Sequence, residues 1–249
     1  IPSLNFDRDN DGGSIRIPDQ DEAGFLAQID HSFSPDGYYT EGPYYQRYAI
    51  YPFLIFAQAL NNKKPELKIF EYRDSVLLKG VYSLLEQTNK DGEFYPINDA
   101  QKGMSVLSRE LIAAVSLAYE IGGRDEALLP YIALQDRVPL NEAGMIAALG
   151  LKNFEDFNTI ERHSLEISDG ANGDEGALGI LRNTRDGDEV SVIMKYTKHG
   201  MGHGHFDKLS FFSYLNGEEL YQDYGSARWV NIEQKGGGRY LPENKTWTK

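Results

Sequence analysis

The chain contains no cysteine among its 249 residues. A disulfide framework, a thiolate metal site and a cysteine nucleophile are therefore excluded. This absence is compatible with both the cytosol and the periplasm. The sequence also lacks any apolar run of membrane-spanning length, so we expect no membrane span.

Positive charge is scarce in this chain. There are 25 Lys and Arg against 38 Asp and Glu, which gives a formal net charge of −13 at pH 7. Because binding to nucleic acid depends on cationic surface, this balance argues against a nucleic-acid partner. An anionic small substrate remains compatible, since a small basic pocket can lie on an acidic surface. The chain also has no phosphate-binding loop, dinucleotide fingerprint or nucleophile elbow.

An acidic segment near the N-terminus, residues 7–12, resembles the opening of a calcium loop. In such a loop a bidentate glutamate closes the coordination sphere at the twelfth position. That position is Pro18 here, so the pattern fails. We interpret the segment as a solvated loop.

The first half of the chain has a helical period. Between about residues 21 and 151 the apolar residues recur as they do on one face of a helix. Helices are expected at residues 48–61, 65–87, 105–121, 125–134 and 141–149. Pro52 suits a first helical turn, and Gly122-Gly123 suits a C-terminal cap. Helices without intervening strands indicate helical hairpins packed in a ring or layer.

After about residue 157 the apolar period changes to two. Strands are expected at residues 164–168, 176–181, 189–196, 206–215 and 218–222. Asp186-Gly187 and Asn216-Gly217 are signals for two-residue hairpins. This pattern predicts an antiparallel sheet, packed as a sandwich. The fold class is therefore α+β, with a helical domain at residues 1–155 and an antiparallel β-sandwich domain at residues 156–249.

Two of the five histidines lie in the glycine-rich segment 202–208. If the backbone is extended there, His203 and His205 lie on the same face. The flanking glycines would let a substrate or another chain segment approach closely. Imidazole transfers protons and binds metals near neutral pH. Two interpretations are open: a functional site, or a pair of solvated loop histidines.

Sixteen tyrosines are present, and many cluster in residues 36–51. Aromatic rings pack on the apolar face of a sugar, so the cluster is typical of a carbohydrate cleft. Glu41, Tyr44 and Arg47 would form a ligand surface in which Arg47 binds a carboxylate through two hydrogen bonds. The alternative is that Arg47 pairs with Glu41 and that the tyrosines belong to the core.

Further polar residues follow the last predicted hairpin. That hairpin could bring Asp223 back beside the histidine pair, and an imidazole with a carboxylate makes part of a zinc-type site. Arg228, Arg239 and Tyr240 follow on glycine-rich backbone. Such backbone also occurs in flexible linkers, so composition leaves their role open.

Seven segments of the chain occur together in one known family. They are residues 41–48, 70–74, 96–100, 169–171, 200–208, 223–225 and 239–244. In this order they resemble the oligoalginate lyases of polysaccharide lyase family seventeen, and more widely the heparinase II/III-like lyases. The similarity covers nearly all of the chain after about residue 24. Each segment alone is a weak signal, whereas the combination is specific.

The resemblance implies a helical (α/α) toroid followed by an antiparallel β-sandwich, with the active site between them. It implies exolytic β-elimination on alginate oligosaccharides, with release of an unsaturated uronate monosaccharide. The residues that match the family's catalytic positions are Tyr45, Arg47, His203, Arg228 and Tyr240. We assign Tyr45 as the acid and Tyr240 as the base.

Residue chemistry adds further expected roles. Substrate-binding residues are expected at Glu41, Tyr44, Arg47, Arg228 and Arg239. Either Arg228 or Arg239 would favour ionisation of the base Tyr240. A histidine that the family carries upstream, in an Asn-His pair without a counterpart here, is the alternative base. We therefore expect this sequence to be a piece of a longer protein and to hold part of the site.

The resemblance also implies a structural zinc. Its ligands would be His205, Asp223 and a third histidine beyond Lys249. The implied partner is an oligo-uronate substrate, the candidate assembly is a homodimer, and the implied location is the bacterial periplasm or the exterior.

Two other functions stay open, because the residue types suit any uronate and the family's Asn-His pair has no counterpart here. One is a lyase of the same architecture that acts on a glycosaminoglycan such as heparin or heparosan. The other is a non-catalytic fragment that binds carbohydrate.

Overall fold

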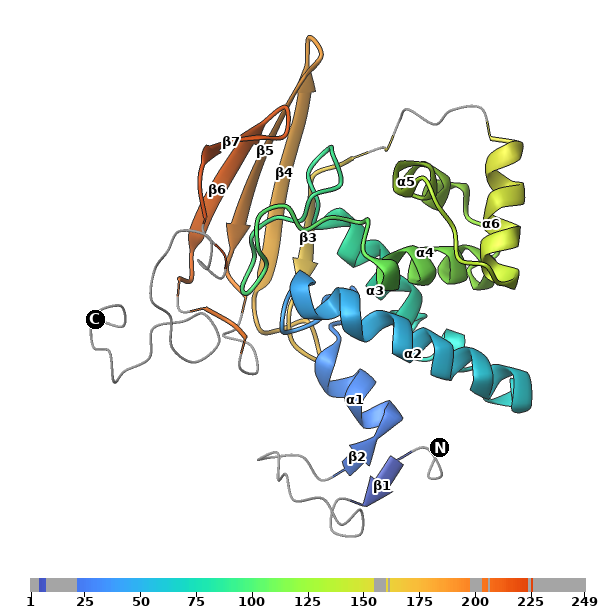
Figure 1. The fold of residues 1–249 in the computed structure, drawn as a ribbon. Coiled ribbons are helices and arrows are strands. Elements are labelled where there is room, and N and C mark those ends of the chain that lie inside the picture. The colour runs from blue at the N-terminus through green and yellow to red at the C-terminus, as the bar shows by residue number, and fades with distance from the viewer. Residues whose placement is uncertain are drawn as a thin grey trace.

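A computed structural model describes residues 5–7, 22–154, 160, 162–197, 203–205, 207–223 and 225. Helices dominate the first part of the chain, and a five-stranded antiparallel sheet forms the second (Figure 1). The α+β class is thereby confirmed. The predicted domain boundary at residues 155/156 lies partly outside the described residues and stays a prediction.

The helical part begins after a two-stranded antiparallel pair, β1 (Asn5–Asp7) and β2 (Glu22–Gly24). Its α-helices are α1 (Phe25–Ser32), α2 (Pro43–Lys63), α3 (Val76–Glu86), α4 (Arg109–Ile121), α5 (Leu129–Gln135) and α6 (Glu142–Lys152). Short 3-10 turns are η2 (Pro65–Leu67), η3 (Ile69–Glu71) and η4 (Glu126–Leu128).

Local chemistry explains several of these helix ends. The Ser108 hydroxyl accepts a hydrogen bond from Leu111 N at the start of α4, and the Asn141 side chain accepts one from Gly144 N at the start of α6. Both residue types are favoured N-caps because their oxygens satisfy free backbone N–H groups. Gly122 caps α4 as predicted.

Two helical expectations were wrong in detail. Pro52 lies inside α2 rather than in its first turn, because Pro43 after Gly42 already starts the helix. The expected helix at residues 65–87 is broken into η2, η3 and α3, because Arg73, Asp74 and Ser75 adopt positive φ. That left-handed backbone cannot continue an α-helix.

The sheet has the strand order β3-β4-β5-β6-β7, and every neighbouring pair is antiparallel. The strands are β3 (Leu165–Ser168), β4 (Ala177–Arg185), β5 (Asp188–Lys195), β6 (Ser210–Leu215) and β7 (Glu218–Tyr221). Both predicted hairpin turns are confirmed, since Asp186-Gly187 and Asn216-Gly217 each place two residues at positive φ.

Loops of the helical part cover one face of the sheet. Tyr38, Tyr95 and Ile97 are buried against sheet residues that include Ile180 and Phe212. The Arg182 guanidinium on β4 extends this junction by binding both the carboxylate and the backbone carbonyl of Glu86, each at 2.5 Å. The larger core cluster packs separately among α1 to α6. The loops that reach the sheet are the ones that carry the candidate site.

Candidate functional site

One buried carboxylate connects three of the site residues. Asp99 Oδ2 accepts a hydrogen bond from the Tyr45 hydroxyl at 3.3 Å and lies 3.0 Å from His203 Nδ1. The other oxygen, Asp99 Oδ1, lies 3.0 Å from His205 Nε2. The structure therefore brings together the first turn of α2, the loop between α3 and α4, and the histidine segment before β6.

The loop that carries Asp99 is fixed on both sides. Tyr95 N donates to Gln87 O, and Phe94 N donates to Met104 O. Tyr95 and Ile97 insert into the sheet core, while Asn98 adopts a φ of 53° that turns the chain. Asp99 is consequently only 3% exposed.

The two histidines lie outside the predicted strand. The strand expected at residues 206–215 begins at Ser210, and His203 and His205 belong to the loop that precedes it. Their side chains nevertheless reach the same carboxylate. Leu209 explains the late start, because its φ of 62° interrupts the extended backbone before Ser210.

Tyr45 and His203 form a stacked pair. Their ring centroids are 3.7 Å apart with an interplanar angle of 27°. Burial, together with the negative charge of Asp99, raises the pKa of Tyr45 to about 12. The Tyr45 phenol therefore stays protonated at neutral pH and is a proton donor.

Glu41 lies on the other side of His203. Its Oε1 is 3.9 Å from His203 Nε2, beyond hydrogen-bond distance. Burial raises the pKa of Glu41, and the electrostatic attraction between its carboxylate and the His203 imidazole opposes this rise. The imidazole is thus placed between two carboxyl groups, with Nδ1 at Asp99 and Nε2 near Glu41.

Arg47 contacts tyrosine rings rather than Glu41. Its guanidinium lies 5.0 Å from the ring centroid of Tyr44 and 4.6 Å from that of Tyr48, and it donates to the Tyr48 hydroxyl at 2.7 Å. No ion pair joins Arg47 to Glu41, so that alternative is wrong. The tyrosines differ in burial. Tyr38 belongs to the core, whereas Tyr44 and Tyr45 are half-buried at the surface. Cation–π contact orients the guanidinium without neutralising it.

Asp223 follows β7 and lies within electrostatic range of His205. Burial raises the pKa of Asp223, while the Lys195 ammonium opposes the rise. Lys195 has no solvent exposure and donates to Asp207 Oδ1 at 2.6 Å. Although burial opposes ionisation of Asp207, this ammonium lowers its pKa below the ordinary value. The Lys195–Asp207 ion pair thus joins the end of β5 to the segment that follows His205.

Two of the expected zinc ligands, His205 and Asp223, lie among the described residues. Within them, no three His, Cys, Asp or Glu side chains gather closely enough to bind a metal ion. His205 and Asp223 are suitable donors that lie near each other, and Asp99 occupies His205 Nε2, which leaves Nδ1 as the remaining ring nitrogen. The donor types of these two residues suit zinc, and a further ligand would be needed to complete a site.

Three expected site residues, Arg228, Arg239 and Tyr240, lie outside the described residues. Residues 96–100 are part of the family resemblance, but no sequence pattern identified Asp99, Lys195 or Asp207 as site residues. The only sequence signal for Asp99 is a carboxylate in a Pro/Asn turn between two helices. Such a turn residue is ordinarily solvated.

In the part of the chain that the structure covers, no helix has the length and apolar character needed to cross a bilayer.

Comparisons with known proteins bear on this geometry. Residues 168–249 match the family described as "Heparinase II/III-like, C-terminal". The chain is 47% identical over 230 residues to the "Exo-oligoalginate lyase" of Saccharophagus degradans, which covers 92% of this chain and 31% of that protein. It is 46% identical over 229 residues to the "Alginate lyase" of Stenotrophomonas maltophilia, covering 92% of this chain and 30% of that protein.

The chain therefore spans about a third of the length of these two relatives. The similarity extends over both the helical part and the sheet, since it takes in nearly the whole chain. The predicted resemblance to oligoalginate lyases, and to heparinase II/III-like proteins over residues 168–249, is confirmed.

Proposed function

We propose that the protein to which this chain belongs cleaves alginate oligosaccharides by β-elimination, exolytically, with release of an unsaturated uronate. The observation that carries the proposal is the stacked pair of Tyr45 and His203 on Asp99. It occurs in a chain that is 47% identical to an exo-oligoalginate lyase over 92% of its length.

Elimination requires three things from the protein. A base removes the C5 proton, which is acidic because it lies α to the uronate carboxylate. The electron pair of that C–H bond forms the C4–C5 double bond, and the C4–O bond breaks. An acid protonates the leaving oxygen, and cationic or hydrogen-bond donors stabilise the charge that develops on the carboxylate.

In this proposal Tyr45 is the acid. Tyr45, with its raised pKa, retains a proton that it can give to the leaving oxygen. Arg47, already oriented by Tyr44 and Tyr48, is placed within two residues of Tyr45 to bind the substrate carboxylate. Tyr240 as base, with Arg228 and Arg239 beside the substrate, completes the proposal, and the upstream histidine remains the alternative base.

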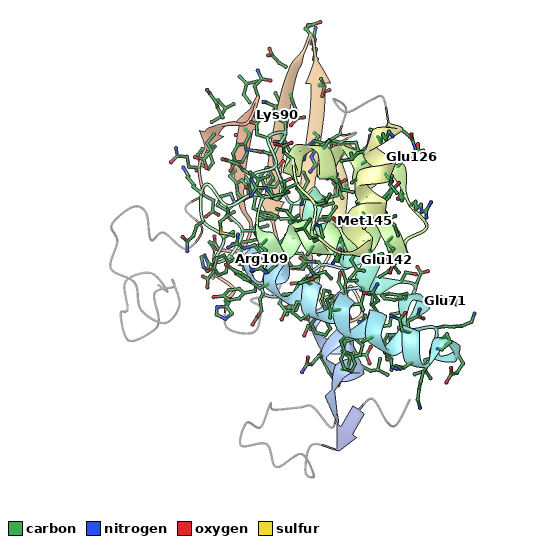
Figure 2. The ribbon with its side chains drawn as sticks, turned by 45° about the vertical axis from the view of Figure 1, so that its right-hand side comes forward. Glu71, Lys90, Arg109, Glu126, Glu142 and Met145 are labelled. Atoms are coloured by element: carbon green, nitrogen blue, oxygen red, sulfur yellow. The ribbon has the colours of Figure 1, made fainter. Side chains whose placement is uncertain are left out.

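The proposed architecture is a helical toroid joined to a β-sandwich. Exposed apolar side chains on both parts support it. Met145 on α6, labelled in Figure 2, is 67% exposed, and Leu149 on the same helix is also exposed. The outer face of the sheet presents Met194 and Phe211. Apolar faces of this kind are typical of surfaces that further elements cover.

A structural zinc is part of the proposal. His205 and Asp223 would bind it with a third histidine from elsewhere in the protein, and the ion would tie the histidine loop to the end of β7. Elemental analysis of the full-length protein should give about one zinc per chain. The His205→Ala and Asp223→Ala variants should lose it. A full zinc content in either variant would remove that residue from the ligand set.

A homodimer and a periplasmic or extracellular location stay predictions.

The test of function is a substrate panel. Full-length protein is mixed with oligoalginate, heparosan, heparin and polygalacturonate, and the ultraviolet absorbance of the unsaturated product is followed. We expect absorbance from oligoalginate, with monosaccharide as the first product by chromatography. Early release of mixed short oligomers would indicate endolytic cleavage instead.

The same panel separates the alternatives. Product from heparosan or heparin but not from alginate would favour the glycosaminoglycan lyase, which the heparinase II/III-like match to residues 168–249 makes a specific competitor. Binding of oligoalginate without product would favour the non-catalytic carbohydrate-binding protein.

A further inference from the structure

Asp99 uses both carboxylate oxygens on residues of the proposed site. Oδ2 is within hydrogen-bond distance of the Tyr45 hydroxyl and His203 Nδ1, and Oδ1 is within hydrogen-bond distance of His205 Nε2. We propose that Asp99 is the positioning residue of this site: a single carboxylate fixes the ring orientation of both histidines and accepts a hydrogen bond from the hydroxyl of Tyr45. This inference rests on the proposed function, because the groups that Asp99 orients are those assigned to the lyase reaction.

The first step of the argument concerns His203. A carboxylate accepts hydrogen bonds and donates none, so the 3.0 Å contact places the proton of neutral His203 on Nδ1. Nε2 then carries the lone pair. That nitrogen points toward Glu41, at 3.9 Å, and away from Asp99. Asp99 thus fixes which nitrogen of His203 meets the substrate, as the second partner of a functional histidine commonly does.

The second step concerns Tyr45. Its hydroxyl contact with Asp99 is 3.3 Å, longer than the imidazole contact and weaker than a typical hydroxyl–carboxylate bond. The ring is held independently by stacking on His203. Tyr45 is therefore placed by its ring, while its proton is only loosely held by Asp99. A loosely held proton can transfer to a substrate oxygen without loss of ring position.

The third step concerns the link between the two histidines. His203 and His205 are separated by one glycine, and each ring nitrogen that contacts Asp99 is 3.0 Å from a different oxygen. One carboxylate therefore sets the spacing of both rings. Because Asp99 is 3% exposed and its loop is bonded on both sides, it holds this spacing before substrate binds.

The experiment compares three variants of the full-length protein. Asp99→Asn keeps the side-chain volume but offers one acceptor oxygen and one NH2 group, so it cannot accept from both histidines. Asp99→Ala removes both acceptors. Asp30→Asn is the matched control, since Asp30 also accepts from a tyrosine hydroxyl, that of Tyr72, at 2.9 Å. The readouts are kcat and KM on oligoalginate, thermal unfolding, and nitrogen-15 NMR of the histidine tautomers.

We expect kcat to fall by about 10²-fold in Asp99→Ala and by about tenfold or more in Asp99→Asn, the scale found when the partner of a functional histidine is lost. KM should change by less than about threefold, because Asp99 is only 3% exposed and is therefore shielded from the substrate. Asp30→Asn should keep the wild-type kcat. In wild-type protein His203, identified by the signal lost in His203→Gln, should be protonated on Nδ1.

The proposal is overturned if Asp99→Asn and Asp99→Ala both fold and keep kcat within threefold of wild type. It is also overturned if the wild-type His203 proton is found on Nε2, a result that needs no variant to fold. If the wild-type protein makes no unsaturated product, the proposed function fails, and the tautomer measurement still decides whether Asp99 orients His203.

Discussion

Replacement of Tyr45 by phenylalanine separates a chemical role from a structural one. The change removes one oxygen and keeps the ring that stacks on His203 at 3.7 Å. The lost hydrogen bond to Asp99 is long, at 3.3 Å, so its contribution to stability should be at the low end of about 0.5–1.5 kcal/mol. The folded structure should therefore survive the substitution with a small change in melting temperature.

The expected effect on the reaction is much larger. If the Tyr45 hydroxyl protonates the leaving oxygen, its loss should reduce kcat by about 10²-fold or more, the usual contribution of a general acid. That factor corresponds to about 2.7 kcal/mol of transition-state stabilisation. Because the proton moves only in the transition state, kcat and kcat/KM should fall together.

The assay uses full-length protein, oligoalginate and the absorbance of the unsaturated product. Tyr82→Phe is the matched control, because the Tyr82 hydroxyl also donates to a carboxylate, Asp125 Oδ2, at 2.6 Å, and lies on α3 outside the site. Tyr82→Phe should turn over at the wild-type rate. Wild-type kcat in Tyr45→Phe would refute the assignment of Tyr45 as the acid. A fall in kcat matched by a large loss of stability would show that the hydroxyl acts on the fold.

Three other predictions concern stability. Arg182→Met should destabilise the protein by about 3 kcal/mol in urea unfolding, because it breaks a buried guanidinium–Glu86 contact. Arg185→Met on the same strand should change stability by less than about 0.5 kcal/mol, since Arg185 is exposed; equal losses in the two variants would contradict this. Burial raises the pKa of Tyr45, Tyr131 and Tyr196 to about 12, whereas unfolded tyrosine ionises near pH ~10. The folded state thus binds more protons above pH ~10, so the melting temperature should fall as pH rises from there toward ~12, and a flat profile would be evidence against buried phenols. Gly176→Ala should cost more than about 2 kcal/mol, because φ is 90° and a Cβ would lie 1.9 Å from Tyr196 O. Gly187→Ala has a similar φ of 91° with open space around it, so it should cost only about 1–2 kcal/mol; equal losses would show that φ alone decides.

The amino-acid sequence by itself determined most of the local structure. Helical periodicity located α4 and α6, since a helix with one buried face must repeat its apolar residues every three to four positions. Asp186-Gly187 and Asn216-Gly217 located both hairpin turns, because few other residue pairs tolerate two successive positive φ values. The family resemblance selected Tyr45, Arg47, His203 and His205 as candidates before any contact was known.

Local rules failed where distant contacts or backbone strain decided the outcome. Pro52 was placed at a helix start, yet Pro43 starts α2 and the packed helix continues through Pro52. The strand before Leu215 was predicted to start at residue 206, yet the left-handed backbone at Leu209 delays its start to Ser210. A short apolar pattern carries no information about either event.

The role of Asp99 was decided only by the tertiary structure. It lies 54 residues from Tyr45 and 104 residues from His203 along the chain, so no spacing in the sequence links them. They meet because Tyr95 and Ile97 anchor the Asp99 loop in the sheet core, while the first turn of α2 and the loop before β6 reach the same place. A sequence pattern fixes which residues share a face of one element, whereas the packing of different elements fixes which carboxylate faces which imidazole.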